Sequence, residues 1–306
     1  MKKLLFVLML TLLPLTANAK TAGNLDIYAC ESVWGSLASE IVKDKANVLN
    51  LTSPTQDPYY LTKNKGLVIS VRSADLIFCN GLDLEKNWLP GVIEKAHNIK
   101  IRPAGNGYFI AADYIPNKSI NPHFHLNPYN IAIVAKEFTK RISEINPTNA
   151  NFYQKNYEDF VGRWNNSIVF WEKQAANLKG MPIIVQSDSW EYLAGWLGLK
   201  IISTLQQDRS IIRNSNHLND VLKDSKINPA EVVLYAPYDN KDLTLWFYKK
   251  SKIRSVMLPY TVYGDVNTKD LFSLFNNTLD ILIKVSDREP IKVPVENKLE
   301  NQPLPN

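Results

Sequence analysis

The chain has 306 residues, of which 45% are hydrophobic and 21% are charged. This apolar content is enough to bury one large core or two modest ones, and it excludes a chain that is mainly disordered. Lys and Arg (35) exceed Asp and Glu (30) by five. The charges are scattered and form no basic stripe, so nucleic acid is not expected as a partner. Beyond residue 20, no run of about 18 apolar residues is present that would cross a bilayer.

The first 19 residues have the pattern of a cleavable signal peptide. Lys2 and Lys3 precede an apolar stretch, Leu4 to Leu15, that is too short for a stable membrane-spanning helix, and Ala17-Asn18-Ala19 is a small-x-small cleavage site. The mature chain is expected to begin at Lys20. No Cys stands at the cleavage point after the apolar stretch, so a lipid anchor is not indicated. The pattern predicts export and a protein that is free in the periplasm.

The sequence contains two cysteines, Cys30 and Cys79. Export would place both in an oxidising compartment, where a disulfide between them can form. Closing a loop of about 50 residues would stabilise the fold by roughly 4 kcal/mol in the chain-entropy treatment. Two buried free thiols are the alternative, and the sequence leaves both readings open.

After the signal peptide, short β-branched runs alternate with segments of helical period, which predicts parallel sheets flanked by helices. Asn127 followed by Pro128 is a typical helix start, and Asn146-Pro147 a typical stop. The first half of the chain is predicted to contain strands at Leu25–Ala29, Val48–Leu51 and Asp75–Cys79, and helices at Trp34–Val42, through Val68 and Val71, around Glu85–Ala96 and from Pro128 to Ile145.

One long amphipathic helix is predicted from Pro147 to Lys179, and Gly180 is expected to end it. About 30 residues at 1.5 Å rise give a strut of roughly 45 Å, long enough to join two lobes. Its apolar residues recur at steps of three or four, namely Tyr153, Tyr157, Phe160, Trp164, Ile168, Trp171, Ala175 and Leu178.

Strands and helices alternate again beyond Gly180, so the fold class is α/β, with two lobes, each a mostly parallel sheet flanked by helices, joined by one long helix. The expected domains are an N-terminal lobe (20–146), the linking helix (147–179) and a C-terminal lobe (180–288). The Pro-rich segment 289–306 is expected to be disordered. The predicted strands of this half are Pro182–Gln186, Lys200–Leu205, Val232–Tyr235 and Ser255–Leu258, and the helices are Trp190–Leu197, Leu218–Leu222, Leu243–Tyr248 and Leu271–Ile283.

Several short motifs, in this order and around the long helix, resemble the periplasmic zinc/manganese-binding component of ABC importers. They cover most of the mature chain and are Ala29-Cys30-Glu31-Ser32-Val33-Trp34, Gln56-Asp57-Pro58, Ala74-Asp75-Leu76 with Asn80-Gly81-Leu82-Asp83-Leu84-Glu85, Asn121-Pro122-His123, Ser189-Trp190-Glu191-Tyr192-Leu193, Trp196-Leu197-Gly198-Leu199 and Leu258-Pro259-Tyr260-Thr261-Val262. The resemblance implies a monomer that holds a metal ion between two lobes and docks on an ABC permease in the inner membrane.

The metal site departs from the pattern of that family. By the resemblance, His is expected after Asp-Pro and two residues before Ser-Trp, and this chain has Tyr59 and Ser187 there. The histidine of Asn-Pro-His is kept as His123, and Tyr260 aligns near the family's fourth ligand, a carboxylate. A tetrahedral Zn²⁺ site needs three or four N, S or O⁻ donors. Of the family's histidine ligands, this chain keeps one, His123.

Two replacement ligand sets follow from neighbouring residues. His123 and His125 with Asp57 and Asp188 would hold zinc through nitrogen and oxygen donors, more weakly than three imidazoles. Tyr59, His123, Asp188 and Tyr260 would form a harder set that suits ferric iron. The resemblance itself favours Zn²⁺, with Mn²⁺ as a second cargo.

Structural roles compete with each assignment. Tyrosines in the position of Tyr59 and Tyr60 more often line a cleft than bind a metal. Asp188, which precedes an apolar run, is typical of a helix N-cap. His97 and His217 are interpreted as structural or surface residues.

Three functions remain in competition at this point. The leading hypothesis is a binding component for metal uptake. The second is a diverged paralogue that holds a metal chelate, a small organic ligand or a protein partner. The third is an enzyme, for example a hydrolase that uses Ser187 or Ser189, but no nucleophile-elbow motif or other strong catalytic signature is present. The sequence therefore predicts a binding protein and not an enzyme.

Overall fold

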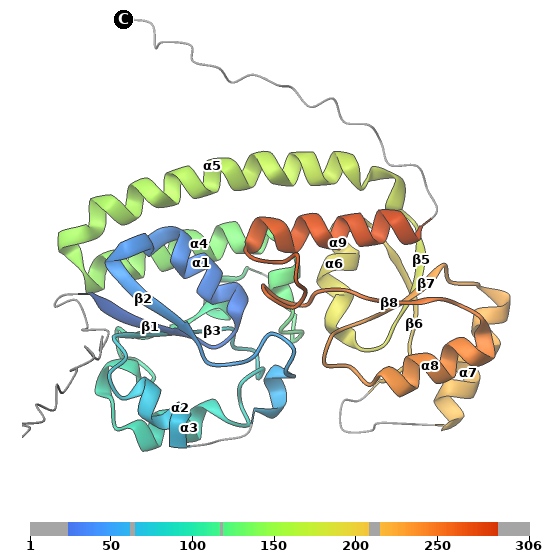
Figure 1. Ribbon diagram of the computed structural model, residues 1–306, viewed down its shortest axis with the longest axis horizontal. Coiled ribbons are helices and arrows are strands. Elements are labelled where there is room, and N and C mark those ends of the chain that lie inside the picture. Colours follow the sequence, from blue (N-terminus) through green and yellow to red (C-terminus); the bar gives the residue numbers. More distant parts are fainter. Residues whose placement is uncertain (1–23, 62–64, 117–118, 208–214, 287–306) are drawn as a thin grey trace, which may run out of the picture.

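The computed structural model describes residues 24–61, 65–116, 119–207 and 215–286 (Figure 1). The predicted signal peptide (1–19) and the predicted disordered tail (289–306) lie outside these ranges. None of the helices within them is both long and apolar enough to cross a membrane.

The N-terminal lobe is built on a four-stranded parallel sheet with the strand order β2-β1-β3-β4. Apolar faces at helical spacing explain how its helices pack; α1, for example, buries Trp34, Leu37 and Ile41. The elements of this lobe are β1 (Leu25–Ala29), α1 (Ser32–Val42), β2 (Ala46–Asn50), α2 (Lys65–Val71), β3 (Leu76–Cys79), α3 (Leu89–Ala96), β4 (Tyr108–Ile110) and α4 (Pro128–Ile145).

The C-terminal lobe repeats this topology with a second four-stranded parallel sheet, in the order β6-β5-β7-β8. A capping box formed by Asp270 and Ser273 starts its last helix, which lies along the long helix α5 in Figure 1. The elements are β5 (Pro182–Val185), α6 (Glu191–Leu197), β6 (Lys200–Thr204), α7 (Ser215–Ile227), β7 (Val232–Tyr235), α8 (Lys241–Ser251), β8 (Ser255–Met257) and α9 (Leu271–Val285).

The long helix α5 (Ala150–Gln174) runs over both lobes (Figure 1). Its 25 residues correspond to about 37 Å. Trp164 donates its indole N–H to the carbonyl of Pro128 in α4 (2.9 Å). Trp171 stacks on Phe275 of α9, with ring centroids 5.1 Å apart. One continuous hydrophobic core includes residues of both lobes and of α5. The predicted two-lobe α/β fold is thereby confirmed.

Differences from the prediction include two helix boundaries and one strand. The long helix ends at Gln174, five residues early, because the chain tightens into a 3₁₀ turn at Ala176–Leu178 before Gly180. The helix predicted around Glu85 begins only at Leu89, since Leu82 and Asp83 have positive φ angles that no α-helix accommodates. The short edge strand β4 was not predicted.

Candidate functional site

The predicted site residues lie in loops that follow strands at the carboxyl ends of both sheets. This is where open parallel sheets bind ligands. Asp57 and Tyr59 follow β2, Asp188 follows β5, and Tyr260 follows β8. His123 lies between β4 and α4. The two lobes therefore each contribute residues to one region.

His123 is fully buried between the two lobes, at 0% exposure. Its backbone N–H donates to the side chain of Asn121 (2.9 Å). Its Nδ1 is 2.7 Å from the hydroxyl of Tyr260, and its Nε2 is 3.8 Å from Oδ1 of Asp188. Both of these partners belong to the C-terminal lobe, so the imidazole connects the lobes.

Asp188 presents a half-exposed carboxylate (49%) to His123. It is the first residue of a 3₁₀ turn, Asp188–Trp190, and the residue at the N-cap position is Ser187. Asn121 donates to the Asp188 carbonyl (2.9 Å) and to the Glu191 carboxylate (2.8 Å). The Asn-Pro-His motif thereby fixes the position of Asp188 relative to the ring of His123.

Tyr260 is buried (2% exposed) and contacts both predicted histidines. Its carbonyl is 3.1 Å from Nε2 of His125. A carbonyl only accepts, so this nitrogen carries the proton. Nδ1 of His125 is then the lone-pair nitrogen, and it has no hydrogen-bond partner among the described residues. Burial lowers the pKa of His125 to about 4, so the ring is neutral near pH 7.

Tyr59 faces His123 from the N-terminal lobe, with ring centroids 6.1 Å apart. Asp57 accepts the backbone N–H of Tyr59 (3.0 Å) and so caps the 3₁₀ turn Pro58–Tyr60 that presents the phenol. The Trp88 indole donates to the carbonyl of Pro58 (2.9 Å), which anchors this turn to the start of α3. Asp57 thus has a structural role in placing Tyr59.

The distance between His123 and Asp188 is compatible with two ligands of one metal ion. Two donor atoms that each lie about 2.1 Å from a tetrahedral ion are about 3.4 Å apart. The observed separation of 3.8 Å needs a shift of only a few tenths of an ångström. Metal-bound imidazoles commonly use their second nitrogen in a hydrogen bond that orients the ring. The Tyr260 hydroxyl occupies that position on Nδ1.

Tyr238 belongs to the same region, although it was not among the residues predicted from the sequence. Its hydroxyl is 3.2 Å from Oγ of Ser189, which is 2.9 Å from Oγ of Ser187. Its ring lies 5.1 Å from that of Tyr260. The signal that could have found it is its position three residues after β7, beyond the carboxyl end of a parallel strand. The other two histidines lie elsewhere: His97 ends α3, and His217 contacts the Thr204 carbonyl.

The two cysteines are joined by a disulfide, with Cα atoms 4.7 Å apart. Within the described ranges, one group of three His, Cys, Asp or Glu side chains has all ligand atoms within 4.8 Å, and it consists of Cys30, Cys79 and Glu85. Its sulfurs are bonded to each other, so they are not available to a metal. The predicted set of His123, His125, Asp57 and Asp188 forms no such group.

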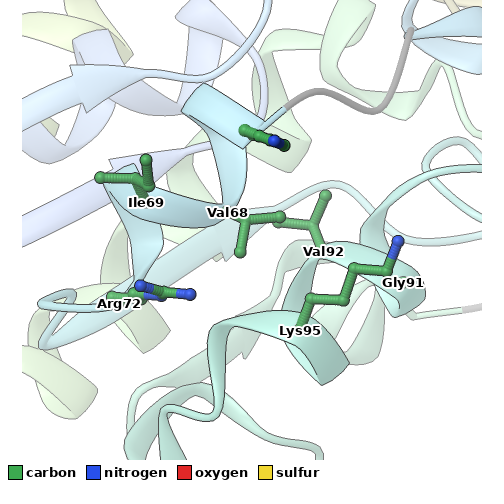
Figure 2. Close-up of a pocket in the computed structure, with 7 residues that line it drawn as sticks. Val68, Ile69, Arg72, Gly91, Val92 and Lys95 are labelled. Atoms are coloured by element: carbon green, nitrogen blue, oxygen red, sulfur yellow. The ribbon is translucent and has the colours of Figure 1, made fainter.

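A separate cavity of about 450 Å³ lies between α2 and α3 (Figure 2). None of the predicted site residues lines it. The residues that line it are apolar or cationic and offer no metal ligands. They are Val68, Ile69, Gly91 and Val92 with Lys65, Arg72 and Lys95.

The fold is shared with solved structures of periplasmic metal-binding proteins. A crystal structure of ZnuA superposes with a TM-score of 0.71 at 16% identity, covering 85% of this chain and 98% of that one. The Cd-bound periplasmic metal binding protein from Candidatus Liberibacter asiaticus superposes with a TM-score of 0.72 at 19% identity, covering 86% and 100%. At these identities the likeness shows the fold alone.

Sequence comparison shows the family. The manganese ABC transporter substrate-binding lipoprotein PsaA of Streptococcus mitis is 30% identical over an alignment of 183 residues, which covers 53% of this chain. The match spans 58% of the length of that relative, so little more than half of it is aligned. Residues 27–285 match the family described as zinc-uptake complex component A, periplasmic. This match includes nearly all of both lobes, and the chain therefore belongs to the ZnuA family.

Proposed function

We propose that this protein is the substrate-binding component of a metal ABC importer, which captures a divalent metal ion between its lobes and delivers it to a membrane permease. The observation that carries the proposal is the position of His123, buried between the lobes with Nε2 directed at the carboxylate of Asp188. Its membership of the ZnuA family supports the same function. The family consists of binding components, which agrees with the prediction that the chain is not an enzyme.

His123 and Asp188 are the two ligands that we propose first, and Tyr59 is the third candidate on geometric grounds. Tyr260 and His125 are assigned to the support of the site, because Tyr260 contacts Nδ1 of His123 and His125 is bonded to the Tyr260 carbonyl. Water is expected to complete the coordination. Asp57, which caps the turn of Tyr59, is not carried forward as a ligand.

Zinc and manganese are the two cargoes that we propose. The family is described by zinc uptake, and the relative PsaA is named for manganese. One imidazole with oxygen donors is a harder ligand set than three imidazoles, and this shifts the preference from zinc towards manganese. The comparisons give no support to ferric iron as the cargo.

A diverged binding protein is the second candidate. It is favoured by the aromatic wall that Tyr59, Tyr238 and Tyr260 place beside the single aligned histidine. Such a wall fits a chelated metal or a small organic ligand. In either case we propose that the protein works outside the cytoplasmic membrane, in keeping with the predicted signal peptide, and as a monomer.

Equilibrium dialysis of the purified mature protein with Zn²⁺ and with Mn²⁺ tests the proposal. We expect binding tighter than micromolar for at least one ion, and a loss of at least about tenfold in His123→Ala, because a lost ligand removes a direct metal bond. His97→Ala is the matched control, since His97 is exposed at the end of α3. Wild-type protein that binds neither ion would leave the diverged binding protein as the better explanation.

A further inference from the structure

Two glutamates are buried side by side in the N-terminal lobe, close to the candidate metal site. Glu31 and Glu85 are each 3% exposed. Glu31 follows β1 and Glu85 follows β3, and these strands are neighbours in the sheet. The disulfide between Cys30 and Cys79 joins the ends of the same two strands. A carboxylate oxygen of Glu85 lies within 4.8 Å of both sulfurs, and Glu31 is the residue after Cys30, so the two glutamates meet beside the disulfide.

Glu85 uses its carboxyl group to hold a turn of the backbone. Oε1 accepts the N–H of Asn80 (2.6 Å), and Oε2 accepts the N–H of Gly81 (3.0 Å). Gly81, Leu82 and Asp83 all have φ between +50° and +85°. Left-handed backbone at non-glycine residues costs about 1 kcal/mol each, so this turn needs the two hydrogen bonds that Glu85 provides.

Glu31 has no such partners. Neither of its oxygens accepts an N–H or a hydroxyl hydrogen among the described residues, although it occupies the N-cap position of α1. The group that it meets is the carboxyl of Glu85. Burial, and then the charge of Glu85, raise the pKa of Glu31 well above its usual value. Burial also raises the pKa of Glu85, to about 7, although its two N–H donors oppose the shift. Tyr108 is a further titratable group that the charge of Glu85 reaches.

These observations assign the proton of the pair to Glu31. Two adjacent buried carboxylates repel each other, so one of them keeps a proton. The carboxylate that accepts two N–H groups is the better anion, and this is Glu85. Glu31 is then a carboxylic acid whose O–H donates to Glu85.

Two sets of hydrogen bonds connect the residues next to the pair with the candidate site. The side chain of Asn80 donates to the carbonyl of Pro122 (2.8 Å), which directly precedes His123. On the other side, Ser32 and the backbone N–H of Val33 each contact the Thr261 hydroxyl at 3.0 Å, next to Tyr260. A change in the pair therefore reaches both His123 and the residue that orients its ring.

We propose that Glu31 and Glu85 are positioning residues of the metal site, and that one proton shared between them fixes the Asn80–Gly81 turn and, through Pro122, the ring of His123. This inference rests on the proposed function for its effect on metal binding. It does not rest on that function for the protonated pair itself.

Four variants test the inference. Glu31→Gln keeps a neutral hydrogen-bond donor beside Glu85, whereas Glu31→Leu removes it at similar size. Glu85→Gln places an amide NH₂ against one of the two backbone N–H donors. Glu94→Gln, on the exposed side of α3, is the matched control. For Zn²⁺ and Mn²⁺, we expect affinity within about threefold of wild type in Glu31→Gln and Glu94→Gln, and losses of about tenfold or more in Glu31→Leu and Glu85→Gln, as is usual when groups that orient metal ligands are removed.

Two measurements on metal-free protein test the pair independently of cargo. The infrared difference spectrum between wild type and Glu31→Gln is expected to show the loss of one protonated-carboxyl C=O band near neutral pH. Amide hydrogen exchange over residues 79–86 and 119–126 is expected to speed up in Glu31→Leu and Glu85→Gln but not in Glu31→Gln. An infrared spectrum without that band, or equal exchange in Glu31→Leu and Glu31→Gln, would overturn the inference.

The two proposals fail in distinguishable ways. Wild-type protein that binds no metal, but shows the carboxyl band and the expected exchange pattern, contradicts the proposed function alone. Wild-type protein that binds metal with equal affinity in Glu31→Leu and Glu31→Gln contradicts the positioning role alone.

Discussion

At the scale of single residues, the structure separates side chains that face the expected metal position from those that hold them there. From the sequence, four residues were all candidate ligands: Tyr59 at a lost histidine position, Asp57 and Asp188 beside the lost positions, and Tyr260 near the position of the family's carboxylate ligand. In the structure the Tyr260 hydroxyl is on Nδ1 of His123, whereas Asp188 is on the Nε2 side. Only contacts across the two lobes make this distinction, and local sequence carries no information on such contacts.

The buried pair has a consequence for stability that can be measured without any metal. Glu31 has a raised pKa, so the folded protein keeps this proton at pH values where the unfolded chain, with a usual value of 4.5, has lost it. The free energy of unfolding is then reduced as the pH rises above about 5, by up to about 1.4 kcal/mol per pH unit for one proton. Glu31→Gln lacks this proton, so we expect its stability relative to wild type to improve from pH 5 to pH 7.

Urea unfolding of both proteins at several pH values measures the difference, and Glu94→Gln again serves as the control for a glutamate that is exposed. Parallel pH profiles for wild type and Glu31→Gln would show that Glu31 ionises in the folded state as it does in the unfolded chain.

At the scale of elements, the spacing of apolar residues predicted helices correctly where a helix has one long apolar face. Helix α5 was predicted from the spacing of its aromatic residues, and Trp164 and Trp171 are buried as expected. The boundaries that were missed depend on contacts between distant residues. Glu85 has a helix-forming sequence around it, yet its side chain holds the Asn80 and Gly81 N–H groups and keeps the chain out of the helix until Leu89.

Helix α5 is expected to stabilise the C-terminal lobe chiefly through Trp171. This side chain is 1% exposed, stacks on Phe275 and donates to Asn276 of α9 (2.6 Å). Removal of a buried aromatic side chain leaves a cavity, and we expect Trp171→Ala to lower the free energy of unfolding by about 3–5 kcal/mol. Denaturant titration followed by far-UV circular dichroism measures this change.

The adjacent residue provides the control for Trp171→Ala. Phe170 is on the same helix and is 38% exposed, so Phe170→Ala is expected to cost less than about 1 kcal/mol. Equal losses in the two variants would indicate that helix propensity, and not packing on α9, accounts for the effect.

At the scale of the whole molecule, the two lobes are in direct contact with each other. They share one core, and hydrogen bonds cross between them from Ser32 to Thr261, from His123 to Tyr260 and from Asn121 to Asp188. The sequence predicted two lobes joined by a helix, but it could not show this direct contact. A hinge motion would have to break these buried hydrogen bonds, at a cost of about 1 kcal/mol or more each.

We therefore expect metal loading to leave the distance between the lobes nearly unchanged. Spin labels at Lys95→Cys on α3 and Lys223→Cys on α7 report on this distance, since both positions are exposed and lie on the helices of the two lobes that are remote from α5 (Figure 1). Because the native cysteines are joined to each other, the introduced thiols can be labelled selectively. Pulsed electron paramagnetic resonance with and without Zn²⁺ or Mn²⁺, with a chelator as the control, is expected to show a shift of less than about 2 Å in the mean distance. A shift of several times that size would mean that the lobes close on their cargo about a hinge, and that α5 bends or slides as they do so.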